Sequence, residues 1–270
     1  LCGMGRFAAW RSASPLKRWR MVTLSPDLGG GDQLAALTLD PAVRDWLAGN
    51  DDLDPALVGR ARHISPLPPL AEWDIDGAAR FVAEALQADP ARTVVIQVVA
   101  PPGSGRKSFA AAVSANLGMP LLAINTAAIG DEAWETTFVH AQRHAFLHGI
   151  ALAWLNGDQH PARRWPESIA YFPLQFIVRE GHATVTPPAI PHAIHLRVDL
   201  PAPGVQARQR LWQHYAPHVA PSYPDAIAAL AERFNARPGA IAAAATIPNP
   251  TVEGMAHALR DSQRDLLGGL

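Results

Sequence analysis

Short apolar runs alternate with helical segments between residues 91 and 200, and this alternation restricts the chain to few folds. The runs are rich in Val, Ile and Leu, and each is apolar almost throughout instead of at every second residue. Such strands are buried on both faces, as in a parallel sheet that helices cover on both sides. We therefore predict an α/β domain with a parallel five-stranded sheet flanked by helices. Its strands are Thr93–Ala100, Leu121–Asn125, Gly149–Asn156, Leu174–Glu180 and Ala193–Leu200.

Helical periodicity follows the fifth strand. Four helices are expected, at about 204–215, 223–235, 238–246 and 251–267, and they form a small α-helical subdomain. The region before the sheet is divided at the glycine run 29–31, since such a run interrupts regular structure. The predicted organisation is a basic tail at 1–30, a helical connector at 31–90, an α/β core at 91–200 and the helical subdomain at 201–270.

The first predicted strand runs directly into a glycine-rich loop, PPGSGRKS, and a helix follows. Glycines let successive backbone N–H groups point into one concavity at the start of a helix, where phosphate binds. In a complete loop, Gly-x-x-x-x-Gly-Lys-Ser/Thr, lysine follows the last glycine and a hydroxyl follows the lysine. Here Arg106 takes the lysine position and Lys107 the hydroxyl position. We interpret the segment as a vestigial nucleotide-binding loop made of Pro102, Gly103, Ser104, Gly105, Arg106, Lys107 and Ser108.

The two replacements remove different functions. Arginine is longer than lysine, planar and forked, so it does not sit beneath phosphates as lysine does. Lysine offers only donors and cannot be a ligand of Mg²⁺. The alternative is a loop shifted by one residue, which brings Lys107 and Ser108 into the lysine and hydroxyl positions. In that case the chain is an active NTPase that binds and hydrolyses ATP.

The ends of two later strands also lack groups that ATP hydrolysis requires. A hydrolase of this class holds Mg²⁺ with an acidic residue at the end of a later strand, and a neighbouring carboxylate polarises water. Asn156 and Gly157 stand at those positions, and Asp158 comes two residues late. The fourth strand ends in Arg179 and Glu180, where a polar residue that positions water is expected. We therefore predict no catalytic residue, no Mg²⁺ site, and weak or absent ATP binding.

In their order and spacing, these segments resemble AAA+ ATPases. Asp199–Tyr215 is similar to the passage from core to lid subdomain in that superfamily, and Phe234–Ala245 to a later lid helix. More narrowly, the chain resembles the first, degenerate AAA+ module of bacterial tandem AAA+ proteins with an N-terminal winged-helix domain. Ser14–Leu24 is similar to the end of that winged helix, Leu37–Leu57 to the connector, and Thr251–Leu270 to the helix before the second, intact module.

The resemblance implies a P-loop NTPase fold with a helical lid, and it implies roles for residues. Asn156 and Gly157 correspond to the acidic Walker B positions, and Arg179 to the sensor position. The implied function is structural or regulatory, beside an active AAA+ module of a ring-shaped remodelling ATPase. That module lies C-terminal to this chain or acts in trans, and the chain is expected to join a homo-oligomeric ring. The chain is also expected to be a piece from the middle of a longer protein.

The composition argues against several other classes of protein. Of the 270 residues, 49% are hydrophobic and 17% are charged, which suits a chain with a sizeable core. Cys2 is the single cysteine, so neither an internal disulfide nor a cysteine zinc site can form, and a reducing cytoplasm is expected. No apolar run reaches the ~18 residues of a membrane span. The net charge of -1 disfavours general binding to nucleic acid or membrane.

Three smaller features carry weaker predictions. The basic cluster Lys17–Arg20 supports a second alternative, a DNA-binding adaptor that acts through the N-terminal tail. Three histidines recur on one face of a predicted helix: His140, His144 and His148. No carboxylate is placed to complete a metal site there, so we expect this face to be exposed or at an interface. Three tryptophans are expected in the core or between subdomains: Trp134, Trp154 and Trp212.

Overall fold

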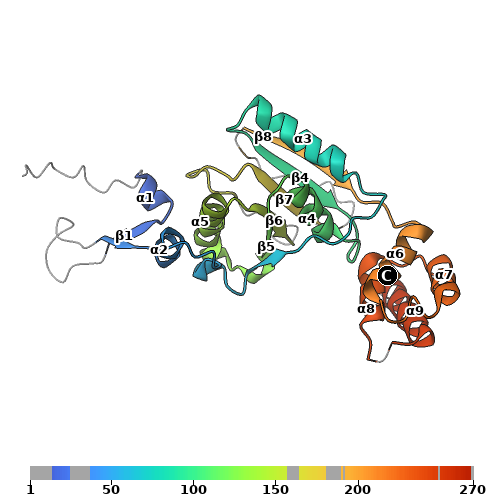
Figure 1. The fold of residues 1–270 in the computed structure, drawn as a ribbon. Helices are drawn as coiled ribbons and strands as arrows, with labels where there is room; N and C mark the ends of the chain where they lie inside the picture. The colour runs from blue at the N-terminus through green and yellow to red at the C-terminus, as the bar shows by residue number, and fades with distance from the viewer. Residues whose placement is uncertain are drawn as a thin grey trace, which may run out of the picture.

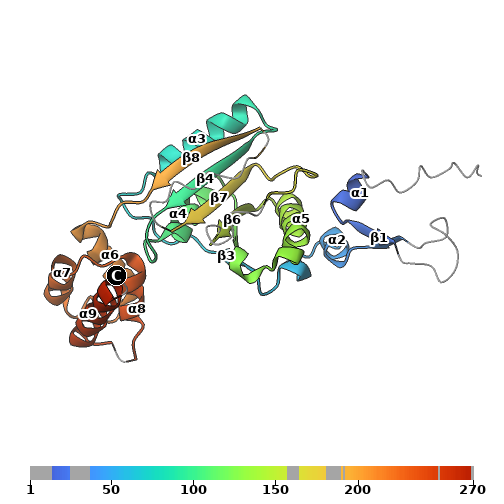
Figure 2. The same ribbon diagram turned by 180° about the vertical axis from the view of Figure 1, so that it is seen from behind.

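A computed structural model describes residues 14–24, 37–156, 164–180, 190, 192–248 and 250–268 (Figure 1). A mixed sheet forms the centre of the molecule, with short N-terminal elements at one end and a helical unit at the other (Figures 1 and 2). No helix within these residues is long and apolar enough to cross a membrane.

The central sheet has six strands in the order β3-β5-β6-β7-β4-β8. Five of them run parallel, as predicted, and the sixth, β3, pairs antiparallel with β5 at one edge. The prediction of five strands was therefore one short. The sequence did not predict β3, because this edge strand includes exposed polar side chains and forms no apolar run. The strands are β3 (Ala61–Ile64), β4 (Thr93–Val99), β5 (Leu121–Asn125), β6 (Ala151–Leu155), β7 (Leu174–Arg179) and β8 (Ala193–Asp199).

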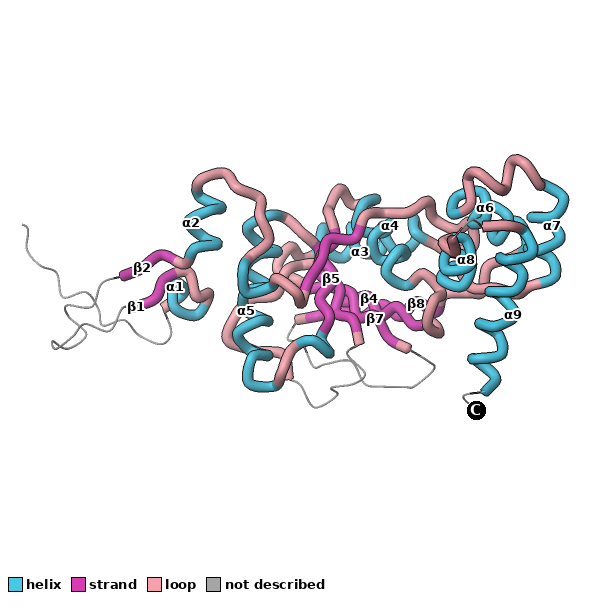
Figure 3. Tube along the Cα trace, turned by 90° about the horizontal axis from the view of Figure 1, so that it is seen from below, coloured by secondary structure: helices cyan, strands magenta, loops and turns pink. Residues whose placement is uncertain are grey.

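Helices flank this sheet. The helices α3 (Ile75–Ala88) and α4 (Arg106–Asn116) pack against each other (Figures 1 and 3). The helix α5 (Asp131–His148) packs against β6 and follows the short 3-10 turn η2 (Thr126–Ala128). Every residue of β4 and of β7 is buried, which explains why both strands are mostly apolar on both faces, with Gln97 and Gln175 among the exceptions.

An aromatic cluster between α5 and the sheet supplies much of the core. Phe138 stacks on Trp154 with ring centroids 4.9 Å apart, and Trp134 and Trp165 meet the Trp154 ring at 5.6 and 5.5 Å. The indole of Trp154 also donates a hydrogen bond to buried Gln175, at 2.8 Å. Offset and edge-on aromatic contacts of this kind stabilise a core beyond the area they bury. The core position predicted for the tryptophans is confirmed, and Trp212 is fully buried in the helical unit.

Four helices after β8 form the C-terminal helical unit, close to the predicted ranges. They are α6 (Val205–Tyr215), α7 (Pro224–Arg233), α8 (Pro238–Ala245) and α9 (Val252–Gly268). Buried Arg208 joins the beginning of α6 to the end of α7, since its Nε donates to the Ala231 carbonyl at 2.8 Å. The same guanidinium donates to the Asn235 side chain at 3.1 Å. Charge-assisted bonds to otherwise unpaired carbonyls hold these helices in one unit.

The N-terminal elements are short. Residues from the predicted basic tail and from the predicted connector form one two-stranded sheet, in which Val22 pairs with Leu39. Part of the predicted helical connector, residues 51–57, contains a short 3-10 turn and no α-helix. The elements are α1 (Pro15–Arg18), β1 (Val22–Leu24), β2 (Leu37–Leu39), α2 (Pro41–Leu47) and η1 (Pro55–Leu57). Residues 1–13 and 25–36, which hold most of the predicted tail, lie outside the described residues.

Candidate functional site

The glycine loop joins the carboxyl end of β4 to the first turn of α4. Gly103 and Gly105 have φ angles of +78° and +87°, a left-handed conformation that strains any residue with a Cβ. Gly105 is the N-cap residue of α4 and offers no capping side chain, so the first amides of the helix keep their donor capacity. The strand, loop and helix therefore follow one another as the sequence predicts.

Arg106 extends away from the loop to the end of β7. Its Nη2 lies 3.0 Å from Glu180 Oε1, and its Nη1 donates to the carbonyl of Arg179. The side chain of Arg106 is 12% exposed, against 52% for Glu180. The guanidinium therefore links β7 to the start of α4, and it does not lie beneath the loop where a lysine would meet phosphate.

A cavity of about 710 Å³ opens beside the loop at the carboxyl ends of the strands. Polar residues from α4, β3 and the ends of β5 and β6 line it, and α8 contributes its first residues. Its polar or charged lining residues are Arg60, Arg62, Arg106, Lys107, Ser108, Asn125, Asn156, Glu180 and Tyr215. Ligands of open α/β sheets bind in such crevices at the carboxyl ends of the strands, so this cavity is the candidate site.

Positive charge dominates the cavity. Burial lowers the pKa of Lys107, and the nearby charges of Arg62 and Arg106 lower it further. Glu180 is the single carboxylate among the described lining residues, and it is already paired with Arg106. Each cation therefore raises the free energy of the others, and an anion in the cavity would lower it.

The groups that would hold a metal ion are neutral. Asn156 has a φ angle of +58° and donates from Nδ2 to Asn125 Oδ1 at 2.9 Å, so the two amides satisfy each other. Thr126 donates to the carbonyl of Leu155 at 2.6 Å, which fixes β6 beside η2. Nowhere in the described ranges do three or more His, Cys, Asp or Glu side chains gather as a metal site. Gly157, the second predicted Walker B position, lies outside the described residues.

The C-terminal helical unit is hydrogen-bonded directly to the loop. The amide of Gly239 donates to the carbonyl of Gly103 at 2.8 Å, and Arg237 donates to the carbonyl of Pro102 at 3.4 Å. A Cβ on Gly239 would lie 2.8 Å from the Gly103 Cα, so α8 approaches the loop as closely as two glycines allow. On the other side, the Trp73 ring would lie 2.8 Å from a Cβ on Gly105. Only about 80 Å³ remains in the apolar slot between Trp73, Tyr215 and Pro238.

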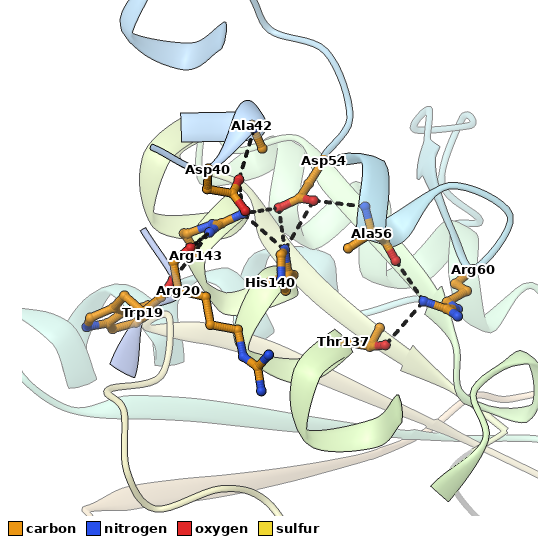
Figure 4. A network of polar contacts seen from close by, with 10 residues as sticks. All are labelled: Trp19, Arg20, Asp40, Ala42, Asp54, Ala56, Arg60, Thr137, His140 and Arg143. Carbon is orange, nitrogen blue, oxygen red and sulfur yellow. Dashed lines mark hydrogen bonds and ion pairs between the residues drawn. The ribbon is translucent and has the colours of Figure 1, made fainter. Parts of the chain in front are cut away.

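A second polar network joins α5 to the N-terminal elements (Figure 4). Arg143 on α5 is 1% exposed, and its Nη2 lies 2.8 Å from both Asp40 Oδ1 and Asp54 Oδ2. Its Nη1 donates to the carbonyls of Trp19 and Arg20. His140 Nδ1 lies 3.0 Å from Asp54 Oδ2. Arg143 Nη2 also lies 3.0 Å from His140 Nδ1 on the same helix. Because its other partners come from residues 19–54, this network fixes the N-terminal elements to α5.

The histidine face of α5 was expected to be exposed or at an interface. Other segments of the chain cover it, so the expectation of exposure is wrong. His144 is 3% exposed, and burial lowers its pKa to about 4, with the neighbouring charge of His148 as the next cause. The spacing of the three histidines places them on one side of the helix but does not reveal what packs on that side. In this structure the covering residues include Asp54 and His63.

Five of the predicted loop residues line the cavity: Gly103, Gly105, Arg106, Lys107 and Ser108. Several other lining residues were not predicted from the sequence. Arg60 and Arg62 reach the cavity only because β3 joins the sheet beside β5, and the local sequence does not predict this pairing. Trp73 and Gly239 belong to segments that are distant from the loop in sequence. The GRARHI cluster at residues 59–64 was the one available signal, since three of its residues are basic or ionisable.

Fold and site together define an α/β protein with a mostly parallel sheet and a basic, metal-poor cavity at a glycine loop, compatible with a Rossmann-like or P-loop-like fold. A comparison with protein-family models finds no match to this chain. A search of curated proteins likewise finds no match.

Proposed function

We propose that this chain is a degenerate AAA+ module that does not hydrolyse ATP and acts as a structural or regulatory part of a ring-shaped remodelling ATPase. The observation that carries the proposal is the position of Arg106. It takes the lysine position of the loop, yet its guanidinium is bound to Glu180 and to the Arg179 carbonyl. A loop without its lysine, beside a strand that ends in Asn156, lacks both the phosphate charge and the metal ligand that hydrolysis needs.

The strand order supports the AAA+ part of this proposal. Numbered along the chain, the parallel strands β8, β4, β7, β6 and β5 lie in the order 5-1-4-3-2. The first strand therefore lies between the fourth and the fifth. This order differs from the doubly wound orders 3-2-1-4-5-6 and 2-1-3-4-5 of dinucleotide and flavin proteins. The helical unit after β8 corresponds to the lid.

In this proposal the partner is an active AAA+ module, C-terminal to the chain or in trans, within a cytoplasmic ring. A fixed lid suits a structural role, because Gly239 and Gly103 bind each other directly and connect lid and core. A homo-oligomeric ring of this chain is part of the same proposal.

The test is steady-state ATP hydrolysis by the purified chain with Mg²⁺, beside the variant Lys107→Ala. We expect no turnover above background in either protein. Turnover that disappears in Lys107→Ala would contradict the proposal. It would favour the second candidate, an active NTPase with a shifted loop, for which the observation is that Lys107 and Ser108 both line the cavity. Analytical ultracentrifugation of the chain with an active AAA+ module tests the proposed partner. Formation of a complex between the two would support it.

A further inference from the structure

Two carboxylates from one stretch of chain face the histidines of α5. This stretch, residues 51–63, is called the covering segment below. Asp54 Oδ2 lies 3.0 Å from His140 Nδ1, a contact that Figure 4 shows. Asp51 Oδ1 lies 3.5 Å from His148 Nδ1. The covering segment therefore follows α5 from His140 to His148.

His144 lies between these two pairs. It is 3% exposed, and its Nε2 is buried with no hydrogen-bond partner among the described residues. The rings that face it belong to His148, with centroids 4.3 Å apart, and to His63 of the covering segment, at 6.4 Å. Arg143 and Asp54 are also close enough to act on its charge. That carboxylate is already paired with Arg143, at 2.8 Å.

A proton on His144 is therefore unfavourable while the covering segment is in place. The imidazolium would be buried beside Arg143 and two further histidines, with no free carboxylate among its described neighbours. Burial and then the charge of His148 lower the pKa of His144 to about 4, although the charge of Asp54 opposes this. When the covering segment moves away, water reaches the ring and its ordinary pKa of about 6.5 returns.

We propose that this face of α5 is a pH-sensitive switch, in which protonation of His144 releases the covering segment. The release extends to the candidate site, because the covering segment runs into β3. Arg60 Nη1 donates to the Ala56 carbonyl at 3.0 Å (Figure 4), and the Arg60 carbonyl accepts from the Asn125 amide at 2.8 Å. Since Arg60 lines the cavity, release of the segment removes part of the cavity wall. The switch goes beyond the proposed function and does not depend on what the cavity binds.

Hydrogen exchange of the full chain at pH 6.5 and pH 4 tests the switch, with each rate corrected for the intrinsic pH dependence of exchange. The amides to follow are those of Leu57, which donates to the Asp54 carbonyl at 2.8 Å, and Arg60, which donates to the Leu57 carbonyl at 3.0 Å. Their protection factors should fall about 100-fold at pH 4, because opening raises the pKa of His144 from about 4 to about 6.5. At both pH values they should be less protected than the amides of β4, since release is local and not global unfolding.

Protection of the covering segment that equals that of β4 at both pH values would overturn the inference, because exchange would then require global unfolding. A fall of less than threefold between pH 6.5 and pH 4 would overturn it too.

Variants connect the pH dependence to one histidine. His144→Gln should remove most of the fall in protection of the covering segment, because glutamine does not titrate. The matched control is His257→Gln on α9, which removes a histidine that is 71% exposed and pairs with Asp261 at 2.7 Å. This control should keep the full pH dependence, and equal flattening in the two variants would contradict the assignment to His144. The exchange of the unsubstituted chain decides the proposal even where a variant does not fold.

Discussion

The Arg143 network allows a quantitative prediction about how the N-terminal elements are held. In Arg143→Met, the carboxylates of Asp40 and Asp54 lose their shared partner, while a side chain of similar length still fills the space. The Asp54 side chain is 3% exposed and that of Asp40 is 15% exposed, so water cannot replace the guanidinium freely. The two carbonyls that accept from Arg143 Nη1 also lose their donor.

Two observations bear on the free energy of unfolding that Arg143→Met should lose. Removal of one partner from a buried ion pair costs about 3–5 kcal/mol, because the other charge stays buried without compensation. Burial alone would raise the pKa of Asp54, but the hydrogen bond and charge of His140, followed by the hydrogen bonds from Arg143 and the Ala56 amide, lower it from 3.8 to about 2. That shift corresponds to about 2 kcal/mol of stabilisation of the carboxylate, present above pH 4 and lost as the pH falls towards 2, and Arg143 supplies only part of it. Since Asp40 is not included in it, about 3 kcal/mol is the lower end of our expectation.

Urea denaturation followed by tryptophan fluorescence measures the loss in free energy of unfolding. The control is Arg44→Met, which breaks the Arg44–Asp45 pair at 3.0 Å, where both side chains are exposed, and which should cost less than about 1 kcal/mol. Addition of Asp54→Asn to Arg143→Met should recover part of the loss, because one buried charge is removed. A loss in Arg143→Met no larger than in the control would refute the reasoning. So would a double variant that is less stable than Arg143→Met.

Three further predictions concern other sites. The pKa of His144 is about 4 in the folded chain and about 6.5 in the unfolded chain. The free energy of unfolding should therefore fall by about 3 kcal/mol from pH 6.5 to pH 4. In His144→Phe, this part of the pH profile of urea midpoints should be flatter. Gly239→Ala should cost about 1–3 kcal/mol through overpacking against Gly103, and Gly130→Ala, which meets nothing within 4 Å, should change the melting temperature little. Glu180→Gln should lower the free energy of unfolding by about 1 kcal/mol or less, because the Glu180 carboxylate that pairs with Arg106 is 52% exposed; a loss above about 2 kcal/mol in urea denaturation would contradict this.

Much of the fold follows from local sequence. A strand that is buried on both faces is apolar at most positions, so β4 and β7 can be predicted without any knowledge of their neighbours. The glycines of the loop can be recognised in the sequence because a positive φ angle excludes most other residues. The spacing of these glycines shows that the lysine is displaced by one position. The four C-terminal helices follow from apolar periodicity of 3.6 residues and from their flanking prolines and glycines.

Only the tertiary structure decided how distant segments meet. The strand β3 has no apolar pattern and depends on the free edge of β5, yet it brings Arg62 to the cavity. Arg143 bonds a carbonyl 124 residues earlier, and no spacing rule along one helix reports a contact of that kind. Sequence by itself determined which residues form the loop and which charges it carries, because backbone conformation and side-chain chemistry are local. Packing between distant segments decides where the Arg106 guanidinium lies and which residues cover the histidines of α5. That packing depends on the whole chain.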